Sequence, residues 1–242
     1  MTTKVFGHKI NYLEVTKSTN DDIWKLLENN SDEGLLIITD HQENGRGRRG
    51  NKWLSRKGNN LLYSYLIKPN LPIDKIGLLS LLTGVSVVEG IIEFTNLQPK
   101  LKWPNDIFFE DKKLGGILAE SKFFNGELYV VMGVGLNVNE INFPIKIAKS
   151  ATSLRIIKNH LIKREPLIAS ILNKFEVLYN KHYTEWLKMW NLHCNHIDSE
   201  VKFHHQNEII NGQFIRINEL GQAILNVNGE IKTISTGTIK EI

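Results

Sequence analysis

Two β-rich segments meet at an Asn-Gly pair near the middle of the chain, and this pattern restricts the possible folds more than any other. Residues 113–124 read "KLGGILAESKFF" and residues 127–139 read "ELYVVMGVGLNVN", with Asn125-Gly126 between them. An Asn-Gly pair between two strands is typical of a tight hairpin turn. Strands that follow one another without an intervening helix argue against a doubly wound parallel sheet.

Helices and further strands are predicted around this hairpin. Apolar residues recur at helical spacing between Ile76 and Ile92, which predicts a long core helix over residues 74–95. Other helices are predicted over residues 18–29, 166–181 and 184–193. Other strands are predicted over residues 10–15, 35–40, 60–68 and 107–109. The sequence therefore predicts an α+β fold, with a mixed sheet and flanking helices.

The pattern changes from about residue 198 onward to short strands. Turn signals interrupt them at Asn211-Gly212, Leu220-Gly221 and Asn228-Gly229. A run of short strands and tight turns is typical of a small barrel or sandwich. We therefore divide the chain into a large domain over residues 1–193 and a small β domain over residues 194–242.

Composition limits the class of protein. The 242 residues are 41% hydrophobic and 23% charged, which is ordinary for a globular protein with a buried core. The single cysteine, Cys194, excludes a disulfide within the chain and fits a reducing compartment. The N-terminus lacks the apolar run of a signal peptide, and no stretch approaches 18 uninterrupted apolar residues. We expect a cytoplasmic protein without a membrane partner.

Positive charge is concentrated in one short segment, although the net charge is only +4. Residues 43–53 read "ENGRGRRGNKW", and the cations of this region are Arg46, Arg48, Arg49, Lys52, Arg56 and Lys57. Arginine pairs bidentately with phosphate oxygens, and glycines let a loop fold over an anion. We expect a loop that mutual repulsion holds open until an anionic ligand orders it.

Two phosphate-binding motifs resemble this segment but do not fit it. "GRGRRG" matches G-x-G-x-x-G, but the continuation "NKWLSRKGNN" lacks the helical periodicity that the dinucleotide fingerprint needs. The P-loop fails because Asn51 precedes Lys52 and Trp53 replaces the magnesium-binding hydroxyl. From this segment alone, two other interpretations remain: a solvated basic loop, or a patch of arginines and aromatic residues that contacts RNA.

A second group of polar residues lies in "KWPND" (102–106) and "KKLGGIL" (112–118). Pro104 stiffens a turn that presents three polar side chains at a strand end, those of Lys102, Asn105 and Asp106. Lys113 begins the next strand, whose Gly115-Gly116 pair lets a flat ligand or a backbone approach closely. A hairpin with glycines at bulges would explain the same residues without a ligand.

Together these motifs closely resemble those of the biotin protein ligases. The match runs in the family's order through "STN" (18–20), "HQENGRGRRGNKW" (41–53), "KWPND", "KLGGIL" and "GVGLNVN" (133–139). It covers essentially the whole chain. The resemblance implies a catalytic biotin- and ATP-binding domain over residues 1–193 and a small SH3-like β-barrel over residues 194–242.

The resemblance implies a two-step ligase reaction. Biotin's carboxylate attacks the α-phosphate of ATP to give biotinyl-5′-AMP and pyrophosphate. A lysine of a carrier protein, such as the biotin carboxyl carrier domain of acetyl-CoA carboxylase, then takes the biotin and releases AMP. The cofactors are expected to be ATP and Mg²⁺, with Mg²⁺ held by the phosphates and near Asp106. A homodimer is also expected, since relatives often pair.

Matching positions imply three groups of site residues. The catalytic groups are Lys113, Arg48, Lys102 and Asp106. Biotin contacts are expected from Ser18, Thr19, Asn20, Gln42, Gly45, Arg46, Arg48, Lys113, Gly115 and Gly116. ATP contacts are expected from Arg48, Arg49, Trp53, Lys102, Asn105, Asp106 and Asn137. Without a ligand role, Trp53 would be a core residue, and Ser18 and Thr19 would cap a helix.

Other interpretations stay open. A lipoate-type ligase has a similar domain and also forms an acyl-adenylate, whereas an RNA-binding protein would use the basic loop. "HCNH" (193–196) with His204-His205 suggests a structural zinc, although the spacing matches no strong zinc pattern. Because the ligase motifs begin within the first twenty residues, we expect no DNA-binding domain, no DNA partner and no repressor activity.

Overall fold

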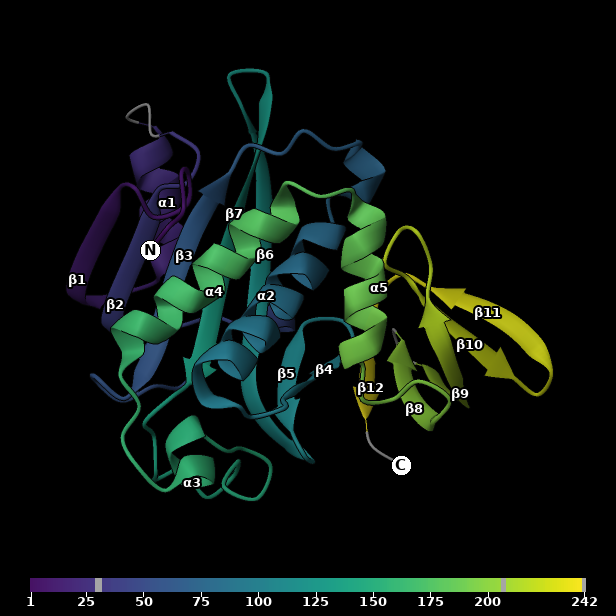
Figure 1. Cartoon of the computed structure of the whole chain (residues 1–242). Coiled ribbons are helices and arrows are strands. Elements are labelled where there is room, and N and C mark those ends of the chain that lie inside the picture. The colour runs from purple at the N-terminus through teal and green to yellow at the C-terminus, as the bar shows by residue number, and fades with distance from the viewer. Residues whose placement is uncertain (29–31, 206–207, 241–242) are drawn as a thin grey trace.

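The computed structural model describes residues 1–28, 32–205 and 208–240, and its largest element is a seven-stranded sheet (Figure 1). Its strands are β1 (Ile10–Thr16), β2 (Leu36–Gln42), β3 (Asn60–Ile67), β4 (Lys100–Lys102), β5 (Asp106–Phe109), β6 (Lys112–Phe124) and β7 (Glu127–Asn137). They lie in the order β1-β2-β3-β7-β6-β5-β4. β1 and β2 run parallel and the other neighbours run antiparallel, which confirms the predicted mixed sheet.

The β6–β7 hairpin forms as the sequence predicts. Asn125 and Gly126 have φ angles of 50° and 80°. A type I′ turn needs positive φ at both central residues, and Asn and Gly adopt it most readily. The register runs from Phe124 opposite Glu127 to Gly115 opposite Leu136, so the hairpin forms the centre of the sheet.

Helices cover both faces of the sheet. α1 (Thr19–Leu27) packs on one face, where Ile23 meets Ile37 and Leu66. Neighbouring strand residues point to the opposite face, so Leu36 and Tyr65 join the larger core instead. That core also contains α2 (Leu78–Thr95), α4 (Arg164–Tyr179) and α5 (Tyr183–His193) (Figure 1).

The predicted long core helix is present as α2, preceded by a single 3₁₀ turn at Ile73–Lys75. The stretch Ile73–Thr95 is long and apolar enough to cross a membrane by length and composition, yet 67% of its most apolar window is buried inside the protein. α4 crosses α2 closely at Gly90, where an added Cβ would lie 2.7 Å from the Ile171 Cα. Packing against other helices therefore explains this apolar sequence.

The C-terminal strands form a second, antiparallel sheet in the order β11-β10-β9-β8-β12. These are β8 (Glu200–His205), β9 (Glu208–Ile217), β10 (Ala223–Val227), β11 (Glu230–Ile234) and β12 (Thr238–Lys240). The sheet fits the expected small SH3-like domain. The turns at Leu220-Gly221 and Asn228-Gly229 are confirmed, since both pairs lie between strands.

The turn predicted at Asn211-Gly212 is wrong, because β9 runs straight through both residues. A Cβ added to Gly212 would lie 2.6 Å from the Asn226 carbonyl oxygen. This glycine therefore permits the close approach of β10 and does not reverse the chain. The short helix α3 (Leu154–Lys158) was not predicted, although Ser153 caps it by accepting a hydrogen bond from the Ile156 N–H at 3.2 Å.

The two sheets share one hydrophobic core. The Trp103 ring lies 5.4 Å from that of Phe203, and the Trp190 ring lies 6.5 Å from that of Phe214. The Trp103 indole also donates to the Gly221 carbonyl at 2.9 Å. The domain boundary at residues 193/194 stays a prediction.

Candidate functional site

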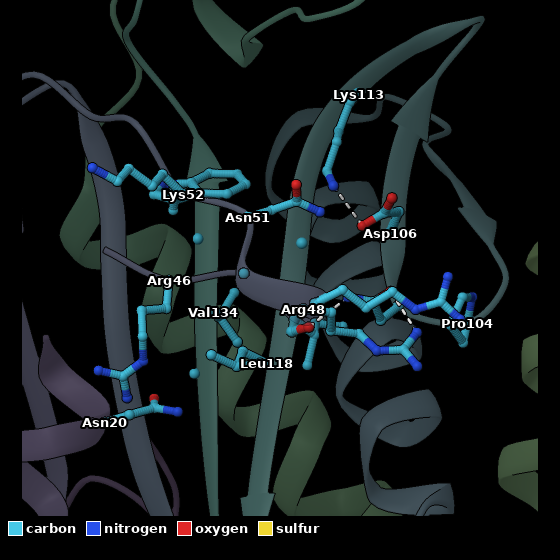
Figure 2. A pocket seen from close by; sticks show the side chains of 18 of the residues that line it. Asn20, Arg46, Arg48, Asn51, Lys52, Pro104, Asp106, Lys113, Leu118 and Val134 are labelled. Carbon is cyan, nitrogen blue, oxygen red and sulfur yellow. Dashed lines mark hydrogen bonds and ion pairs between the residues drawn. The ribbon is translucent and has the colours of Figure 1, made fainter. Parts of the chain in front are cut away.

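A cavity lies between the β6–β7 hairpin, the basic segment after β2, the β4–β5 turn and β12 (Figure 2). It has about 980 Å³ of empty space, part of it open to solvent.

Most of the predicted site residues line this cavity, although they come from distant parts of the chain. They are Ser18, Thr19, Asn20, Gln42, Arg46, Arg48, Arg49, Trp53, Lys102, Asn105, Asp106, Lys113 and Gly116. The basic segment crosses the sheet, since Trp53 packs on Gly135 of β7 and Arg48 reaches Asn105 after β4. This crossing brings residues of α1 and of the β4–β5 turn into one site.

The basic segment folds back on itself. The Gly47 N–H donates to the Asn51 carbonyl at 2.7 Å, and the Trp53 N–H donates to the Gly45 carbonyl at 2.9 Å. Arg49 adopts a left-handed φ of 55°, and its Nη1 donates to the Thr238 hydroxyl of β12 at 3.1 Å. The segment is thus a compact turn attached to the second sheet.

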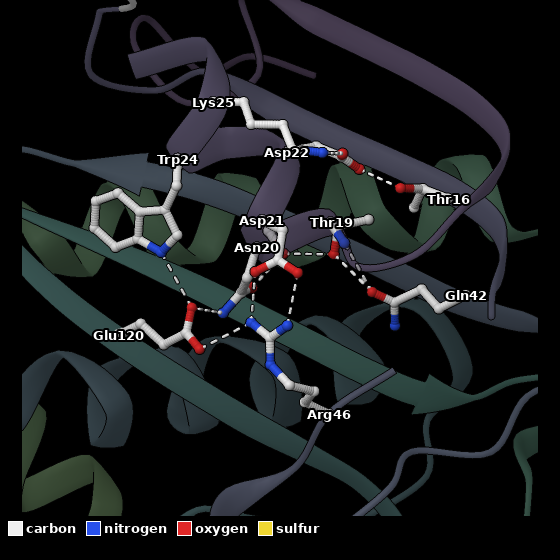
Figure 3. A network of polar contacts seen from close by, with 11 residues as sticks. Thr16, Thr19, Asn20, Asp21, Asp22, Trp24, Lys25, Gln42, Arg46 and Glu120 are labelled. Carbon is white, nitrogen blue, oxygen red and sulfur yellow. Dashed lines mark hydrogen bonds and ion pairs between the residues drawn. The ribbon is translucent and has the colours of Figure 1, made fainter. Parts of the chain in front are cut away.

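Acidic partners distant in sequence neutralise Arg46 (Figure 3). Its Nη1 and Nη2 each donate to one carboxylate oxygen of Asp21 at 2.7 Å, and Nη2 also donates to Glu120 at 3.1 Å. The Arg46 guanidinium lowers the pKa of the Asp21 carboxyl, and hydrogen bonding to Asp21 raises the pKa of Arg46. The expectation that mutual repulsion holds the loop open is therefore wrong for Arg46, whose charge is offset by these carboxylates.

Arg48 is half-buried, as Arg46 is. Its Nη1 donates to the Asn105 side-chain oxygen at 3.3 Å, and Asn105 in turn donates to the Ile117 carbonyl at 2.7 Å. Burial and then the charge of Arg49 lower the pKa of Arg48. Arginine stays protonated even so, and a partly desolvated guanidinium attracts an anion more strongly than one in water.

Lys113 and Asp106 form an ion pair at the cavity wall, with Nζ 2.6 Å from Oδ1 (Figure 2). The backbone of Lys113 is held by hydrogen bonds to the Ser150 carbonyl and from the Thr152 N–H, at 2.8 and 3.0 Å. A Cβ on Gly116 would lie 3.4 Å from the Asp106 carboxylate, so this glycine leaves space beside the pair. With 37% of its side chain exposed, Lys113 can exchange Asp106 for an incoming anion.

The α1 side of the cavity carries amide and hydroxyl groups beside the ion-paired Arg46. The Gln42 Oε1 accepts from the Thr19 N–H at 2.9 Å and from its hydroxyl at 3.1 Å. The Ser64 hydroxyl lies 2.6 Å from that of Thr19 and donates to Asn20 Oδ1 at 2.6 Å. Ser18 occupies the N-cap position of α1 without a side-chain capping bond, so capping does not explain it. These side chains form a buried set of donors and acceptors.

Three predicted residues do not line the cavity. Gly45 lies at a second hollow on the other side of the basic segment. The Cβ position of Gly115 faces the Gly135 carbonyl at 3.0 Å, so this glycine permits strand contact and not ligand contact. Asn137 is buried at the end of β7, opposite Asn60.

Trp53 separates the cavity from the second hollow. A Cβ on Gly135 would lie 2.5 Å from the Trp53 ring, so the indole lies flat on a strand position without a side chain. The second hollow is also lined by Arg56, Glu140 and Phe143. Trp53 therefore lines two neighbouring cavities and is not a core residue.

Sequence reasoning missed several residues around the site. Thr238 and Ile239 of β12 line the cavity, as does Gly133, where a Cβ would lie 2.3 Å from Asn20 Oδ1. Glu120 and Asp21 bind Arg46. Only the position of Asp21 directly after "STN" and the glycine at the start of "GVGLNVN" offered a sequence signal.

Within the described residues, no three His, Cys, Asp or Glu side chains come together as a metal site. In the "HCNH" stretch, His193 Nε2 lies 2.6 Å from Glu89 Oε1, and Cys194 lies 3.5 Å from the His196 ring nitrogens. Burial raises the pKa of the Cys194 thiol to about 12. Among the described residues that line the cavity, Asp106 is the one with a carboxylate side chain.

Known proteins share both the sequence and the fold of this chain. The sequence profile of the biotin/lipoate A/B protein ligase family matches residues 12–137. The bifunctional ligase/repressor BirA of Bacillus subtilis is 34% identical over 245 residues, covering 98% of this chain and 75% of that protein. The biotin–[acetyl-CoA-carboxylase] ligase of Mycobacterium tuberculosis is 28% identical over 237 residues, covering 93% of this chain and 85% of that protein.

A solved structure shares the whole arrangement. The biotin protein ligase from Aquifex aeolicus, in complex with biotin and ATP, superposes with a TM-score of 0.84 at 30% identity. The match covers 96% of this chain and 98% of that chain, and so includes both sheets.

Proposed function

Since this chain belongs to the biotin/lipoate A/B protein ligase family, we propose that it uses ATP to attach biotin to a lysine of a carrier protein. In the first step a biotin carboxylate oxygen bonds to the α-phosphorus of ATP, and the bond from that phosphorus to the β-phosphate oxygen breaks, releasing pyrophosphate. In the second step the carrier's lysine nitrogen bonds to the acyl carbon, the carbon–oxygen bond to AMP breaks, and the nitrogen loses a proton. Biotin and ATP both occur in the complex of the Aquifex aeolicus relative.

One observation supports this proposal above the others: a single cavity is lined both by neutral amide and hydroxyl groups and by the cationic side chains of Arg48, Lys102 and Lys113. Biotin has the same division, with a neutral ureido ring at one end and a carboxylate at the other. Thr19, Asn20 and Gln42 would hydrogen-bond the ring, because buried ureido groups need partners for both donors and acceptors. Ser18 lines the same side of the cavity, whereas Gly116 leaves space beside Lys113.

The cationic groups would bring two anions together. A carboxylate that attacks a triphosphate is repelled by it, so positive charge on both is required. Lys113 would leave Asp106 and bind the carboxylate, then the acyl oxygen and α-phosphate. Arg48 and Lys102 would bind phosphate oxygens from the other wall.

The nucleotide would lie on the Trp53 side of the cavity. Trp53 presents its ring between the cavity and the second hollow, Arg49 lies beside β12, and Asn105 binds Arg48. Asn137 does not line the cavity, so we assign it no ligand contact.

Mg²⁺ would accompany the triphosphate. Protein sites for Mg²⁺ with nucleotides usually supply one or two carboxylates and leave the remaining positions to phosphates and water. Asp106 fits that donor set, since the exchange of Lys113 for a substrate anion would free its carboxylate. The ion would neutralise phosphate charge as pyrophosphate leaves.

Lipoate is the second candidate substrate, because the family profile covers both ligand classes. An RNA-binding loop is less consistent with the structure, since Arg46 is paired and Arg48 is half-buried. The carrier's identity, the cytoplasmic location, the absence of repressor activity and the homodimer stay predictions.

Mass spectrometry of a purified biotin carboxyl carrier domain tests the proposal. We expect one biotin added to one lysine after incubation with the chain, ATP, Mg²⁺ and biotin, and no addition when ATP is left out. A matched reaction with lipoate and its own carrier domain is expected to give no product. Lipoate addition without biotin addition would reverse the choice of substrate.

A further inference from the structure

Glu120 connects two separate walls of the site. Its Oε2 accepts hydrogen bonds from Asn20 Nδ2 and from the Trp24 indole N–H of α1, both at 3.1 Å. Its Oε1 accepts from Arg46 Nη2 of the basic segment at 3.1 Å (Figure 3). Strand alternation places Glu120 on the same face of β6 as Leu118, which lines the cavity. This carboxylate therefore lies just beyond the cavity wall.

One branch of these contacts reaches the amide and hydroxyl groups on the α1 side of the cavity. Asn20 uses Nδ2 for Glu120 and Oδ1 for the Ser64 hydroxyl, so both ends of its amide are fixed. The Ser64 hydroxyl also lies 2.6 Å from that of Thr19, which donates to Gln42. Gly133 leaves the space that this orientation of Asn20 needs.

The other branch holds the beginning of the basic segment. Arg46 binds Asp21 with both of its terminal nitrogens and Glu120 with one of them. Residues 48–53 follow directly and carry Arg48 and Trp53. Only a charged carboxylate serves this position well, because it has about four lone-pair sites and no donor to oppose Arg46.

We propose that Glu120 is a positioning residue. By holding α1 and Arg46 in fixed positions relative to each other, it sets the affinity of the cavity for its small ligand. It does not touch the reacting atoms. The identity of the ligand as biotin rests on the proposed function, whereas the anchoring of Arg46 does not.

The test compares Glu120→Gln with Glu127→Gln in the full chain. Glutamine has nearly the same size as glutamate. Its N–H₂ group, however, would face either Arg46 or the donors of α1, so a donor would oppose a donor. Glu127 lies on the same hairpin, bonds Lys68 and Tyr129 at the surface, and lies outside the cavity, so it controls for loss of a carboxylate. The two readouts are KM and kcat for biotin in adenylate formation, and the rate at which trypsin cuts the ligand-free chain within residues 46–52.

We expect Glu120→Gln to raise KM for biotin about tenfold, the effect of losing one charge-assisted contact, while kcat changes less than about threefold. Tryptic cleavage within residues 46–52 is expected to accelerate at least about threefold, since Arg46 loses a partner. Glu127→Gln is expected to match the unmodified chain in both readouts.

Equal behaviour of the two variants in both readouts would overturn the proposal, as would a loss of kcat at unchanged KM. If the unmodified chain makes no biotinyl adenylate, the proposed function fails, and the cleavage rates still decide whether Glu120 anchors Arg46. Should Glu120→Gln unfold, Trp24→Phe keeps the ring packing and removes a single donor. It is expected to raise KM for biotin about threefold, and an unchanged KM in that variant would overturn the proposal.

Discussion

At the scale of single residues, the proposed chemistry centres on the ion pair between Lys113 and Asp106. Two charges 2.6 Å apart in a cavity hold each other in place before any ligand binds. In the proposed mechanism an arriving carboxylate would replace one partner with another, so the ammonium group would not have to be desolvated anew. The pair would therefore prepare the cation for the proposed substrate.

Replacement of Lys113 by glutamine is expected to slow adenylate formation about 100-fold or more, because removing one preorganised donor to a developing charge typically has that effect. Release of pyrophosphate from ATP and biotin measures the rate. Lys112→Gln is the matched control, since Lys112 is an exposed lysine at the preceding position of β6. A Lys113→Gln rate within a few fold of the control would remove Lys113 from the mechanism.

Individual residues were predictable where a short motif carried them. Lys113, Arg48 and Asp106 were predicted because the motifs that contain them resemble those of a known family, and the structure places all three on one cavity. The partners of Arg46 were not predictable, because Asp21 and Glu120 lie 25 and 74 residues away along the chain. A sequence shows which charges are close along the chain, and folding decides which ones pair.

At the scale of elements, the contact between α2 and α4 depends on one glycine. A Cβ at Gly90 would lie 2.7 Å from the Cα of Ile171 and 2.8 Å from its N, which are backbone atoms that side-chain rotation cannot move. The two helices can approach this closely only because Gly90 has no side chain.

Gly90→Ala is therefore expected to destabilise the fold by about 1–3 kcal/mol, the usual effect of overpacking. Gly77→Ala is the control, since Gly77 has a helical φ of −57° and no atom lies within 4 Å of its Cβ position. That variant is expected to be neutral or about 0.4–1 kcal/mol more stable. Urea unfolding of both variants measures the difference, and a larger loss at Gly77 than at Gly90 would contradict the packing argument.

Elements were predictable where periodicity was long or a turn had specific chemistry. The apolar spacing of α2 and the Asn125-Gly126 turn both led to the observed structure. The same reasoning failed at Asn211-Gly212, where the glycine lets the backbone of a neighbouring strand approach closely. A dipeptide indicates conformational freedom, but only the tertiary structure shows whether the chain turns or another backbone approaches.

At the scale of the whole molecule, His196 lies at the junction of the two sheets. It is 5% exposed and its ring lies 4.2 Å from that of Phe214. Burial, and then the nearby charge of Lys102, lower the pKa of His196 to about 3. The His196 imidazole is thus neutral in the folded protein near neutral pH.

The fold is expected to lose stability as pH falls below about 6.5, because the unfolded chain binds a proton at His196 that the folded chain does not. The loss continues down to about pH 3, where the folded state also takes up the proton. Thermal midpoints at pH 7.5 and 5.0 measure this effect, and His196→Gln is expected to show a smaller difference between them. His160→Gln, at an exposed position, is expected to keep the full difference. Equal differences in all three proteins would show that His196 titrates normally.

The cavity wall contains residues from near both ends of the described chain, from Ser18 on one side to Ile239 on the other. β12 belongs to the second sheet, so the cavity is complete only when both sheets are folded. A small molecule that touches both walls would therefore bind only that state, and its binding would stabilise the two sheets together.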